Sequence, residues 1–334
     1  MKSIVVKDNY GLDNLTIQEQ TKPVITENEI LVQVKSVSLN YLDVLIAKGG
    51  FGNHQFPHIL GYDASGIVKE IGSKVSNFKV GDLVCTHYTQ TWQNGEITLN
   101  DMQNRLGTDV QGVFSEYIAL PESSLIKIPC NLTFKEASTL PIAALTAWEA
   151  LVNVGQLKAG QTVLLQGTGG VSIFALQFAK ALGAKVFITS SSDEKLQKAK
   201  ELGADLVLNY RTNNHWQDNV MTETKGIGVD LALEMTGASL NETLGYLKIN
   251  GKVVIVGFLD GSKVDLDVFE ILYRNASIVG IKVGSKSSFA EMNRAIEVNN
   301  IRPFIDKEFN LSDFREAFNY VEQGKHFGKI IINF

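Results

Sequence analysis

The sequence predicts an α/β protein in which a doubly wound parallel sheet follows a β-rich domain. Three observations predict this architecture. Six short apolar segments alternate mostly with helical patterns, a glycine turn follows the first of them, and many short strands with glycine turns precede them. Strands that alternate with helices form parallel sheets, whereas short strands with turns favour a compact barrel-like domain. The six sheet strands are expected at residues 163–165, 185–189, 205–209, 230–234, 252–257 and 277–283.

The residues before the sheet supply the predicted β domain. Alternation of apolar and polar residues predicts strands at residues 4–7 and 30–36, and the pattern changes to a short helix over residues 40–47. Further strands are expected at residues 60–72, 80–85 and 112–120.

Two segments define how the domains connect. A helical pattern over residues 137–151 contains Pro141, which is expected to kink or restart the helix. After the sheet, helical patterns at 287–297 and 311–324 precede a last strand at 329–333, which is expected to return to the first domain. The predicted boundaries are 1–127 for the first domain, 128–283 for the sheet domain and 284–334 for the C-terminal return.

The turn after the first sheet strand indicates a ligand. Gly167, Gly169 and Gly170 lead from the strand into a helical pattern that includes Val171 and Ser172. Glycines let the backbone approach phosphate groups closely, and a helix N-terminus offers free N–H groups with a partial positive charge. Ser172 stands where a third glycine is usual, so a tight turn without a ligand is the alternative. The six alternating strands favour a dinucleotide site.

The composition is that of an ordinary globular protein of two domains. Its 334 residues are 44% hydrophobic and 20% charged, with a formal net charge of −5 at pH 7. No basic surplus indicates a nucleic-acid or membrane partner, and no apolar run approaches the ~18 residues of a spanning helix. The N-terminus has no signal-peptide apolar core, and Cys85 and Cys130 are too few for a disulfide framework. We therefore expect a cytoplasmic location.

Several motifs occur in a fixed order along nearly the whole chain. They are Asn40-x-x-Asp43, Pro57-x-x-x-Gly61-x-Asp63-x-x-Gly66-x-Val68, Val80-Gly-Asp82-x-Val84, Gln166-Gly-Thr-Gly-Gly-Val-Ser172 and Gly257. With these motifs the chain resembles the medium-chain dehydrogenases/reductases, and within them the zinc-independent quinone oxidoreductase (zeta-crystallin-like) branch. The resemblance implies a GroES-like catalytic domain split around a Rossmann domain, with the active site in the cleft. It also implies homodimers joined through the sixth strand.

The resemblance marks three places at which zinc-containing relatives carry a metal ligand. Asn40 stands at the place of a Cys ligand and Tyr62 at the place of a His ligand. The third place falls in the helical segment at 140–151, which has no Cys, His, Asp or Glu before Glu149. A catalytic zinc needs three protein ligands of these types. We therefore expect no zinc.

The end of the second sheet strand discriminates between NAD and NADP. NAD enzymes place Asp or Glu there to bind the ribose 2′-hydroxyl, whereas the resemblance places Ser190 at this position. A serine hydroxyl can donate to a 2′-phosphate, and Ser191 and Lys195 add a donor and a positive charge. By the same resemblance Tyr210 flanks the adenosine phosphate. NADPH is the expected cofactor; a plain turn with an N-cap is the alternative, and Asp193 keeps NADH open.

Without zinc, hydrogen-bond donors must polarise the substrate oxygen. Asn40 is the first candidate to bind that oxygen, with capping of the helix at 41–47 as its alternative role. Tyr62 can donate a hydrogen bond or the proton, or can simply line the pocket. Asp43 is a third catalytic candidate, although its expected main role, like that of Asp63, is to fix loop geometry.

The resemblance also assigns residues to the nicotinamide half of the cofactor. Thr146 is expected to contact the nicotinamide amide, with a core threonine as the alternative. Gly257 and Phe258 are expected to run beside the cofactor, and Lys329 to lie near it.

These expectations combine into a zinc-independent, NADPH-dependent oxidoreductase. Polarisation by hydrogen bonds suits acceptors that conjugation has already activated, so the expected substrate is a small quinone or α,β-unsaturated carbonyl compound. An alcohol or aldehyde oxidoreductase of the same superfamily is the first alternative. A non-catalytic NADPH-binding protein is the second, because the superfamily includes lens crystallins.

Overall fold

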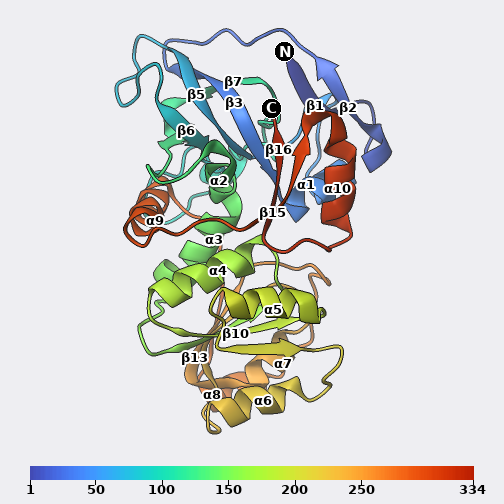
Figure 1. Cartoon of the computed structure of the whole chain (residues 1–334), viewed down its shortest axis with the longest axis vertical. Helices are drawn as coiled ribbons and strands as arrows, with labels where there is room; N and C mark the ends of the chain where they lie inside the picture. Colours follow the sequence, from blue (N-terminus) through green and yellow to red (C-terminus); the bar gives the residue numbers. More distant parts are fainter. The chain divides into compact units, whose positions relative to one another are not determined.

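The computed structural model describes residues 1–334, and the chain forms two units. Unit 1 combines Met1–Leu145 with Val283–Phe334, and unit 2 is Thr146–Lys282. Unit 1 is β-rich, with mostly antiparallel strand pairs, and unit 2 is an α/β structure; Figure 1 labels their helices and strands.

Unit 1 is built on a seven-stranded sheet. Its strands are β3 (Glu29–Leu39), β5 (Asp63–Ile71), β6 (Leu83–Thr86), β7 (Tyr117–Pro121), β8 (Leu125–Lys127), β15 (Ile305–Asn310) and β16 (Lys329–Asn333). The order is β15-β16-β3-β5-β6-β8, with β7 paired to β3 beside this path. The sequence predicts a strand at 112–120, but β7 begins only at Tyr117. The residues before it form a loop whose backbone is hydrogen-bonded to β1.

A smaller sheet and several helices complete unit 1. The sheet has the order β2-β1-β4, and its strands are β1 (Lys2–Val6), β2 (Leu15–Glu19) and β4 (His58–Ile59). The helices are α1 (Tyr41–Ala47), α2 (Phe134–Ala137), α9 (Lys286–Val298) and α10 (Phe314–Glu322). Short 3-10 helices are η1 (Leu12–Asn14), η2 (Asp101–Gln103), η3 (Glu122–Ser124) and η6 (Leu311–Asp313). The apolar face of α10 joins the core because Phe314, Phe318 and Val321 recur at helical spacing.

The last strand of the chain returns to the sheet of unit 1. Figure 1 shows β16, in red, beside β3, in blue, and the register pairs Ile330 with Leu39 in antiparallel fashion. The other neighbour of β16 is β15, which runs parallel to it. The sequence pattern does not predict β15, because this edge strand, Ile-Asp-Lys-Glu-Phe-Asn, is mostly polar and has one buried residue, Phe309.

The helical segment after β8 divides between the two units. It consists of α2, the π-helix η4 (Leu140–Ala144), α3 (Leu145–Trp148) and the π-helix η5 (Glu149–Val154). Pro141 lies in the first turn of η4, where its missing N–H costs no helical hydrogen bond. The sequence predicts the domain boundary after residue 127, whereas the structure places it after Leu145. The reason is that α2 packs on β3 and β5, and η4 packs on β5 and β6.

Unit 2 is a six-stranded parallel sheet. Its strands are β9 (Thr162–Gln166), β10 (Lys185–Ser190), β11 (Leu206–Asn209), β12 (Val229–Glu234), β13 (Leu247–Ile255) and β14 (Ser277–Gly280). The order is β11-β10-β9-β12-β13-β14, and every pairing is parallel. The doubly wound sheet predicted from the sequence is therefore confirmed. The largest differences are at β13, which spans Leu247–Ile255 and not 252–257, and at β14, which ends at Gly280 and not at residue 283.

Five helices connect the strands of unit 2. They are α4 (Gly170–Ala181), α5 (Asp193–Glu201), α6 (Trp216–Glu223), α7 (Leu240–Gly245) and α8 (Val268–Arg274). Helix α4 packs on β9 and β10, α5 packs on β10 and β11, and α7 packs on β12 and β13. The middle of β9 is apolar, with Val163, Leu164 and Leu165 fully buried. A strand covered on both faces favours such a continuous apolar run.

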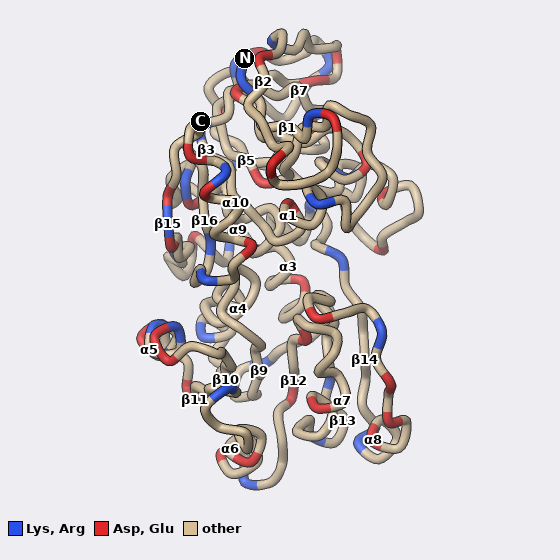
Figure 2. The backbone as a smooth tube through the Cα atoms, turned by 90° about the vertical axis from the view of Figure 1, so that its right-hand side faces the viewer, with Lys and Arg blue, Asp and Glu red and all other residues tan.

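Charged residues of both signs alternate along the chain. Figure 2 shows blue and red segments interspersed, with both colours on α5 and α8. This distribution agrees with the absence of a basic surplus in the sequence. None of the helices combines the length and the apolar character that crossing a bilayer requires.

Candidate active site

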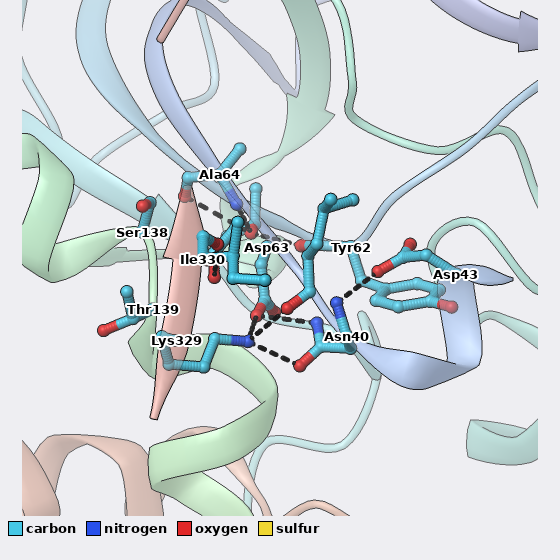
Figure 3. A network of polar contacts seen from close by, with 12 residues as sticks. Asn40, Asp43, Tyr62, Asp63, Ala64, Ser138, Thr139, Lys329 and Ile330 are labelled. Carbon is cyan, nitrogen blue, oxygen red and sulfur yellow. Dashed lines mark hydrogen bonds and ion pairs between the residues drawn. The ribbon is translucent and has the colours of Figure 1, made fainter. Parts of the chain in front are cut away.

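Three strand ends of the unit 1 sheet bring Asn40, Asp63 and Lys329 together. Asn40 follows β3 directly, Asp63 opens β5 and Lys329 opens β16. Because β3 lies between β16 and β5 in the sheet, these three positions meet at one edge. Lys329 Nζ donates to Asn40 Oδ1 at 2.7 Å and lies 3.5 Å from Asp63 Oδ2, and Asn40 Nδ2 donates to the same Asp63 oxygen at 2.9 Å. Figure 3 shows this network, in which Lys329 also donates to the carbonyl of Leu39 at 2.8 Å.

The ion pair in this network is fully removed from water. The side chains of Lys329 and Asp63 are 3% and 0% exposed. Burial raises the pKa of Asp63 to about 6, although the Lys329 ammonium and the Asn40 amide oppose the rise. Burial also lowers the pKa of Lys329, because an ammonium group loses its hydration there. The sheet edge therefore holds a carboxyl group that titrates near neutral pH.

The Asp43 side chain stabilises the first turn of α1 through a hydrogen bond. Its Oδ2 accepts a hydrogen bond from the backbone N–H of Asn40 at 2.7 Å, which is the reciprocal half of a capping box. The Asn40 side chain also contacts Asp63 and Lys329. Asp43 is fully buried, and burial raises the pKa of its carboxyl group well above the ordinary value.

Tyr62 lies beside this network with its phenol group buried. Its ring packs edge-on against Tyr88 with the centroids 5.3 Å apart. Burial first, and then the charge of Asp43, raise the pKa of Tyr62 well above its usual range. The phenol therefore stays protonated and can act as a donor. Tyr62 Oη forms no hydrogen bond of good geometry, but it lies close enough to the Asp43 carboxyl group for the two side chains to interact.

Three buried oxygens of this cluster form no hydrogen bond of good geometry, although the Tyr62 phenol interacts with the Asp43 carboxyl group and Asp63 interacts with the backbone of Ile142. They are Tyr62 Oη, Asp43 Oδ1 and Asp63 Oδ1. A buried polar atom left unpaired costs roughly 1–3 kcal/mol, so proteins rarely retain several in one place without a use for them. A small polar ligand that accepts from the phenol would satisfy part of this unused capacity. The cluster is therefore the candidate active site of unit 1.

The donor atoms of the cluster do not fit a zinc ion. They come from an amide, a phenol and two carboxylates, and one of those carboxylates already pairs with the Lys329 ammonium. No group of three His, Cys, Asp or Glu side chains in the structure is placed to hold a metal. The neighbouring imidazoles of His54 and His58 contact backbone carbonyl oxygens through Nε2, at 2.9 and 3.1 Å.

The glycine turn of unit 2 fits a dinucleotide phosphate. Gly167 has a φ of 71°, in the region that favours glycine, and a Cβ at Gly167 or Gly169 would meet open space. The turn ends at the N-terminus of α4, a helix of 12 residues whose first residues are Gly170 and Val171. Ser172, at the place of the third glycine, donates its hydroxyl to the carbonyl of Gln166 at 2.7 Å.

The residues expected to bind the 2′-phosphate of the adenosine ribose lie at the ends of β10 and β11. Ser190 is the buried last residue of β10, and its carbonyl accepts from the N–H of Tyr210 at 3.2 Å. Ser192, just after Ser191, caps α5 by accepting from the N–H of Lys195 at 3.4 Å. Asp193 accepts from the Asn209 amide at 2.6 Å. The Asp193 carboxylate that kept NADH open in the sequence analysis thus already has a partner.

Four further candidates lie on other elements. Thr146 lies in α3 and is nearly buried, and Gly257 follows β13, where a Cβ would approach the Met235 carbonyl oxygen to 2.7 Å. Phe258 is half exposed in the next position. Lys329, which the sequence analysis assigns to the cofactor, has its ammonium bonded inside unit 1 as described above.

The sequence pattern does not predict the pairing of Lys329 with Asn40 and Asp63. Position 329 opens a strand, and position 63 follows a glycine turn, but their sequence separation hides the contact. A lysine at the start of an otherwise apolar strand, Lys-Ile-Ile-Ile-Asn, was the available indication. Lysines are almost never buried without a partner.

We expect the buried Asp63 carboxyl to make the stability of the fold depend on pH. Its pKa rises on folding from 3.8 to about 6, so the folded protein binds this proton more tightly than the unfolded chain does. Its contribution is therefore fully present below about pH 4 and is lost as the pH rises to about 6. Urea unfolding of the parent and of Asp63→Asn across this window should show a decline that is absent in the variant. Equal slopes would contradict the assignment.

Each unit contains a segment that matches a known protein family. Residues 26–130 match the alcohol dehydrogenase GroES-like domain family, and residues 170–298 match the zinc-binding dehydrogenase family. A zinc-type alcohol dehydrogenase-like protein of Schizosaccharomyces pombe is 38% identical over 341 aligned residues, covering 99% of each chain. The crystal structure of a candidate alcohol dehydrogenase from Sinorhizobium meliloti 1021 has a TM-score of 0.94 and 35% identity, and the match covers 100% of this chain and 98% of that one.

More distant relatives carry other names. The quinone oxidoreductase of Pongo abelii is 27% identical, and the match covers 99% of this chain and 97% of that protein. The quinone oxidoreductase branch named in the sequence analysis is thus represented, at lower identity than the zinc-type alcohol dehydrogenase-like protein. The two matched families and the full-length relatives agree with the two units of the structure. The chain therefore belongs to the medium-chain dehydrogenase/reductase superfamily of NAD(P)-dependent oxidoreductases.

Proposed function

We propose that this chain interconverts a carbonyl compound and its alcohol with an NAD(P) cofactor, and that Tyr62 supplies the proton. The observation that carries the proposal is the Tyr62 phenol, which is buried beside the Asp43 carboxyl group and forms no hydrogen bond of good geometry. Its raised pKa keeps the proton on the oxygen until a substrate oxygen accepts it. The names of the relatives at 38% and 35% identity support the alcohol–carbonyl couple over the quinone reaction expected from the sequence.

Each polar group of the cluster has a role in this proposal. When bound, the reduced nicotinamide supplies a hydride to the carbonyl carbon. Tyr62 donates its proton to the carbonyl oxygen, which leaves the alcohol. Asn40 Nδ2 gives one hydrogen to Asp63 and can offer its second hydrogen to the same substrate oxygen. Asp43 carries a raised pKa, so it can hold the proton that returns to Tyr62.

The fixed charges favour this proton transfer. The Lys329 ammonium holds the Asn40 carbonyl oxygen at 2.7 Å, which turns the Asn40 amide nitrogen toward Asp63 and fixes its hydrogens. Donors that are already oriented stabilise a developing oxyanion without reorganising during the reaction. We propose that these groups act in place of a zinc ion, because the donor set does not fit one.

Reduction of a quinone or an enone is the second candidate. The observation that favours it is the same donor set, because hydrogen bonds polarise an oxygen less strongly than a metal does. Hydride addition to a conjugated acceptor leaves the negative charge delocalised onto the oxygen, so weaker polarisation suffices. The 27% identical quinone oxidoreductase supports this candidate.

We propose NADPH as the preferred cofactor. A serine, Ser190, ends β10 where a carboxylate would repel a 2′-phosphate, and Tyr210 follows the neighbouring β11. Two carboxylates lie in the first turn of α5, and each has a partner: Asp193 accepts from the Asn209 amide, and Glu194 pairs with Lys198.

The experiment is NAD(P)H oxidation in the presence of EDTA, with a saturated aldehyde, an enone and a quinone as separate acceptors. Rapid reduction of the aldehyde with NADPH supports the proposal in full. Activity on the enone or quinone alone supports the second candidate. Activity that EDTA removes and Zn²⁺ restores contradicts the metal-free site. Binding of NADPH without oxidation by any acceptor overturns the enzymatic proposal.

We propose that the protein forms a homodimer through β14 and α8. Strand β14 is the edge of the sheet and has no charge, proline or bulge to prevent pairing with another strand. On α8, Val268, Phe269 and Leu272 are exposed by 65–76%, an unusual apolar surface for a monomer. Two copies related by a twofold axis would cover both features at once. Light scattering at two concentrations tests this, and a monomer at both would contradict it.

A further inference from the structure

The ends of the two central strands of unit 2 are joined by a buried carboxylate. Glu234 is the last residue of β12, and Gln166 is the last residue of the neighbouring β9, with Leu233 and Leu165 in register just before them. Glu234 is fully buried, yet none of the ion pairs of the structure includes it. Its charge must therefore be stabilised by hydrogen-bond donors alone.

Hydrogen bonds surround both oxygens of Glu234. Oε1 accepts from the backbone N–H groups of Thr236 and Gly237, both at 3.0 Å. Oε2 accepts from Gln166 Nε2 at 2.9 Å and from Thr243 Oγ1 at 2.7 Å. Burial acts to raise the pKa of Glu234, but these hydrogen bonds outweigh it and lower the pKa. The carboxylate is therefore ionised at neutral pH.

Gln166 connects this carboxylate to the glycine turn. Its Nε2 donates to Glu234, and its Oε1 accepts from the backbone N–H of Met235 at 3.0 Å, so the amide has one orientation. Its backbone carbonyl accepts from the hydroxyl of Ser172 in α4 at 2.7 Å. The next residue is Gly167. A single side chain thus links the turn after β9 to the loop after β12.

These two loops leave the sheet at its topological switch point. The strand order places β10 and β11 on one side of β9, and β12, β13 and β14 on the other. Connections that follow β9 and β12 therefore diverge, and ligands of open α/β sheets bind in the crevice between such connections. Any shift of one loop against the other would change the shape of that crevice.

We propose that Glu234 is a positioning residue for the dinucleotide. Acting through Gln166, its ionised carboxylate fixes the glycine turn relative to residues 235–237. The inference rests on the NAD(P) cofactor of the proposed function. It does not depend on which substrate is reduced.

The same pair of strands offers a matched control at its other end. Asp230 lies near the start of β12, and its Oδ2 accepts from the N–H of Thr162, the first residue of β9, at 2.8 Å. Asp230 also forms an ion pair with Lys248. Asp230 thus joins the same two strands through a carboxylate, but at the edge opposite to the glycine turn.

The test compares Glu234→Gln with Asp230→Asn by NADPH fluorescence titration and urea unfolding. The Glu234→Gln amide nitrogen would meet N–H donors, so the two loops would separate. Both variants should lose stability, but only Glu234→Gln should raise the Kd for NADPH, by at least about tenfold, or about 1.4 kcal/mol. At saturating NADPH its kcat should stay within about twofold of the parent, because the reacting groups are unchanged.

Three outcomes separate the explanations. An unchanged Kd in Glu234→Gln, or an equal rise in Asp230→Asn, overturns the positioning role. Failure of the parent to bind NADPH or NADH overturns the proposed function and, with it, this inference. Should Glu234→Gln not fold, Thr243→Val removes one donor at constant size and should raise the Kd by about threefold. An unchanged Kd in that folded variant also overturns the inference.

Discussion

Tyr62→Phe is expected to lower kcat by about 10²- to 10⁴-fold, the range over which proton transfer by a positioned side chain contributes. The substitution removes one oxygen that forms no hydrogen bond of good geometry and leaves the ring in place. Stability should therefore be unchanged or slightly higher, because a buried hydroxyl without a good hydrogen bond is lost. The Kd for NADPH should stay the same, because Tyr62 belongs to unit 1 and the glycine turn to unit 2. Steady-state kinetics with an aldehyde and fluorescence titration with NADPH measure both effects.

The matched control for this prediction is Tyr88→Phe. Tyr88 packs against Tyr62 with ring centroids 5.3 Å apart, but its hydroxyl already contacts Thr108 Oγ1 at 3.0 Å. This variant should lose some stability and keep most of its kcat. A Tyr62→Phe variant that retains the parent kcat would show that another group supplies the proton.

Lys329→Met is expected to destabilise the fold by about 3–5 kcal/mol, the usual cost of removing one partner from a buried ion pair. Methionine fills nearly the same volume, but it leaves Asp63 buried without its cation and Asn40 Oδ1 without its donor. Asp63 can escape part of this cost by binding a proton. The loss should therefore be larger at pH 8 than at pH 5, and urea unfolding at both values measures it.

Two controls test the origin of that loss. Lys48→Met breaks the exposed pair with Glu322 and should change stability by less than about 1 kcal/mol. Adding Asp63→Asn to Lys329→Met removes the uncompensated charge and should recover much of the stability at pH 8. Equal losses at pH 5 and pH 8 would show that packing, and not the charge of Asp63, determines the effect.

The sheet of unit 2 shows what local sequence patterns can predict. The apolar run Val163, Leu164 and Leu165 is buried on both faces in the central strand, and the glycine turn follows it in the structure as predicted. The sequence of a parallel strand is a continuous apolar run because helices cover both faces of the sheet. The edge strand β15 is not predicted for the converse reason, since only one of its residues is buried.

The candidate site was predicted in part. Asn40, Asp43 and Tyr62 were identified because they occupy motif positions, and the structure brings the side chain or backbone of each into one cluster. The partner of Asn40 was not identified, because Lys329 lies 289 positions away in the sequence. Glu234 was missed as well, because it ends a predicted strand as a single carboxylate without a motif around it.

By itself the sequence determined the alternating strands and helices of unit 2, the glycine turn and the residue types available for chemistry. These features follow from periodicity, backbone freedom and composition, all of which act between neighbours in the chain. The tertiary structure alone decided which charges are buried together, which hydroxyl forms no hydrogen bond of good geometry and which carboxylates hold loops in place. Those properties arise from contacts between residues such as Asn40 and Lys329 or Gln166 and Glu234. Desolvation depends on which groups surround a side chain in space, and a local sequence pattern does not predict those surroundings.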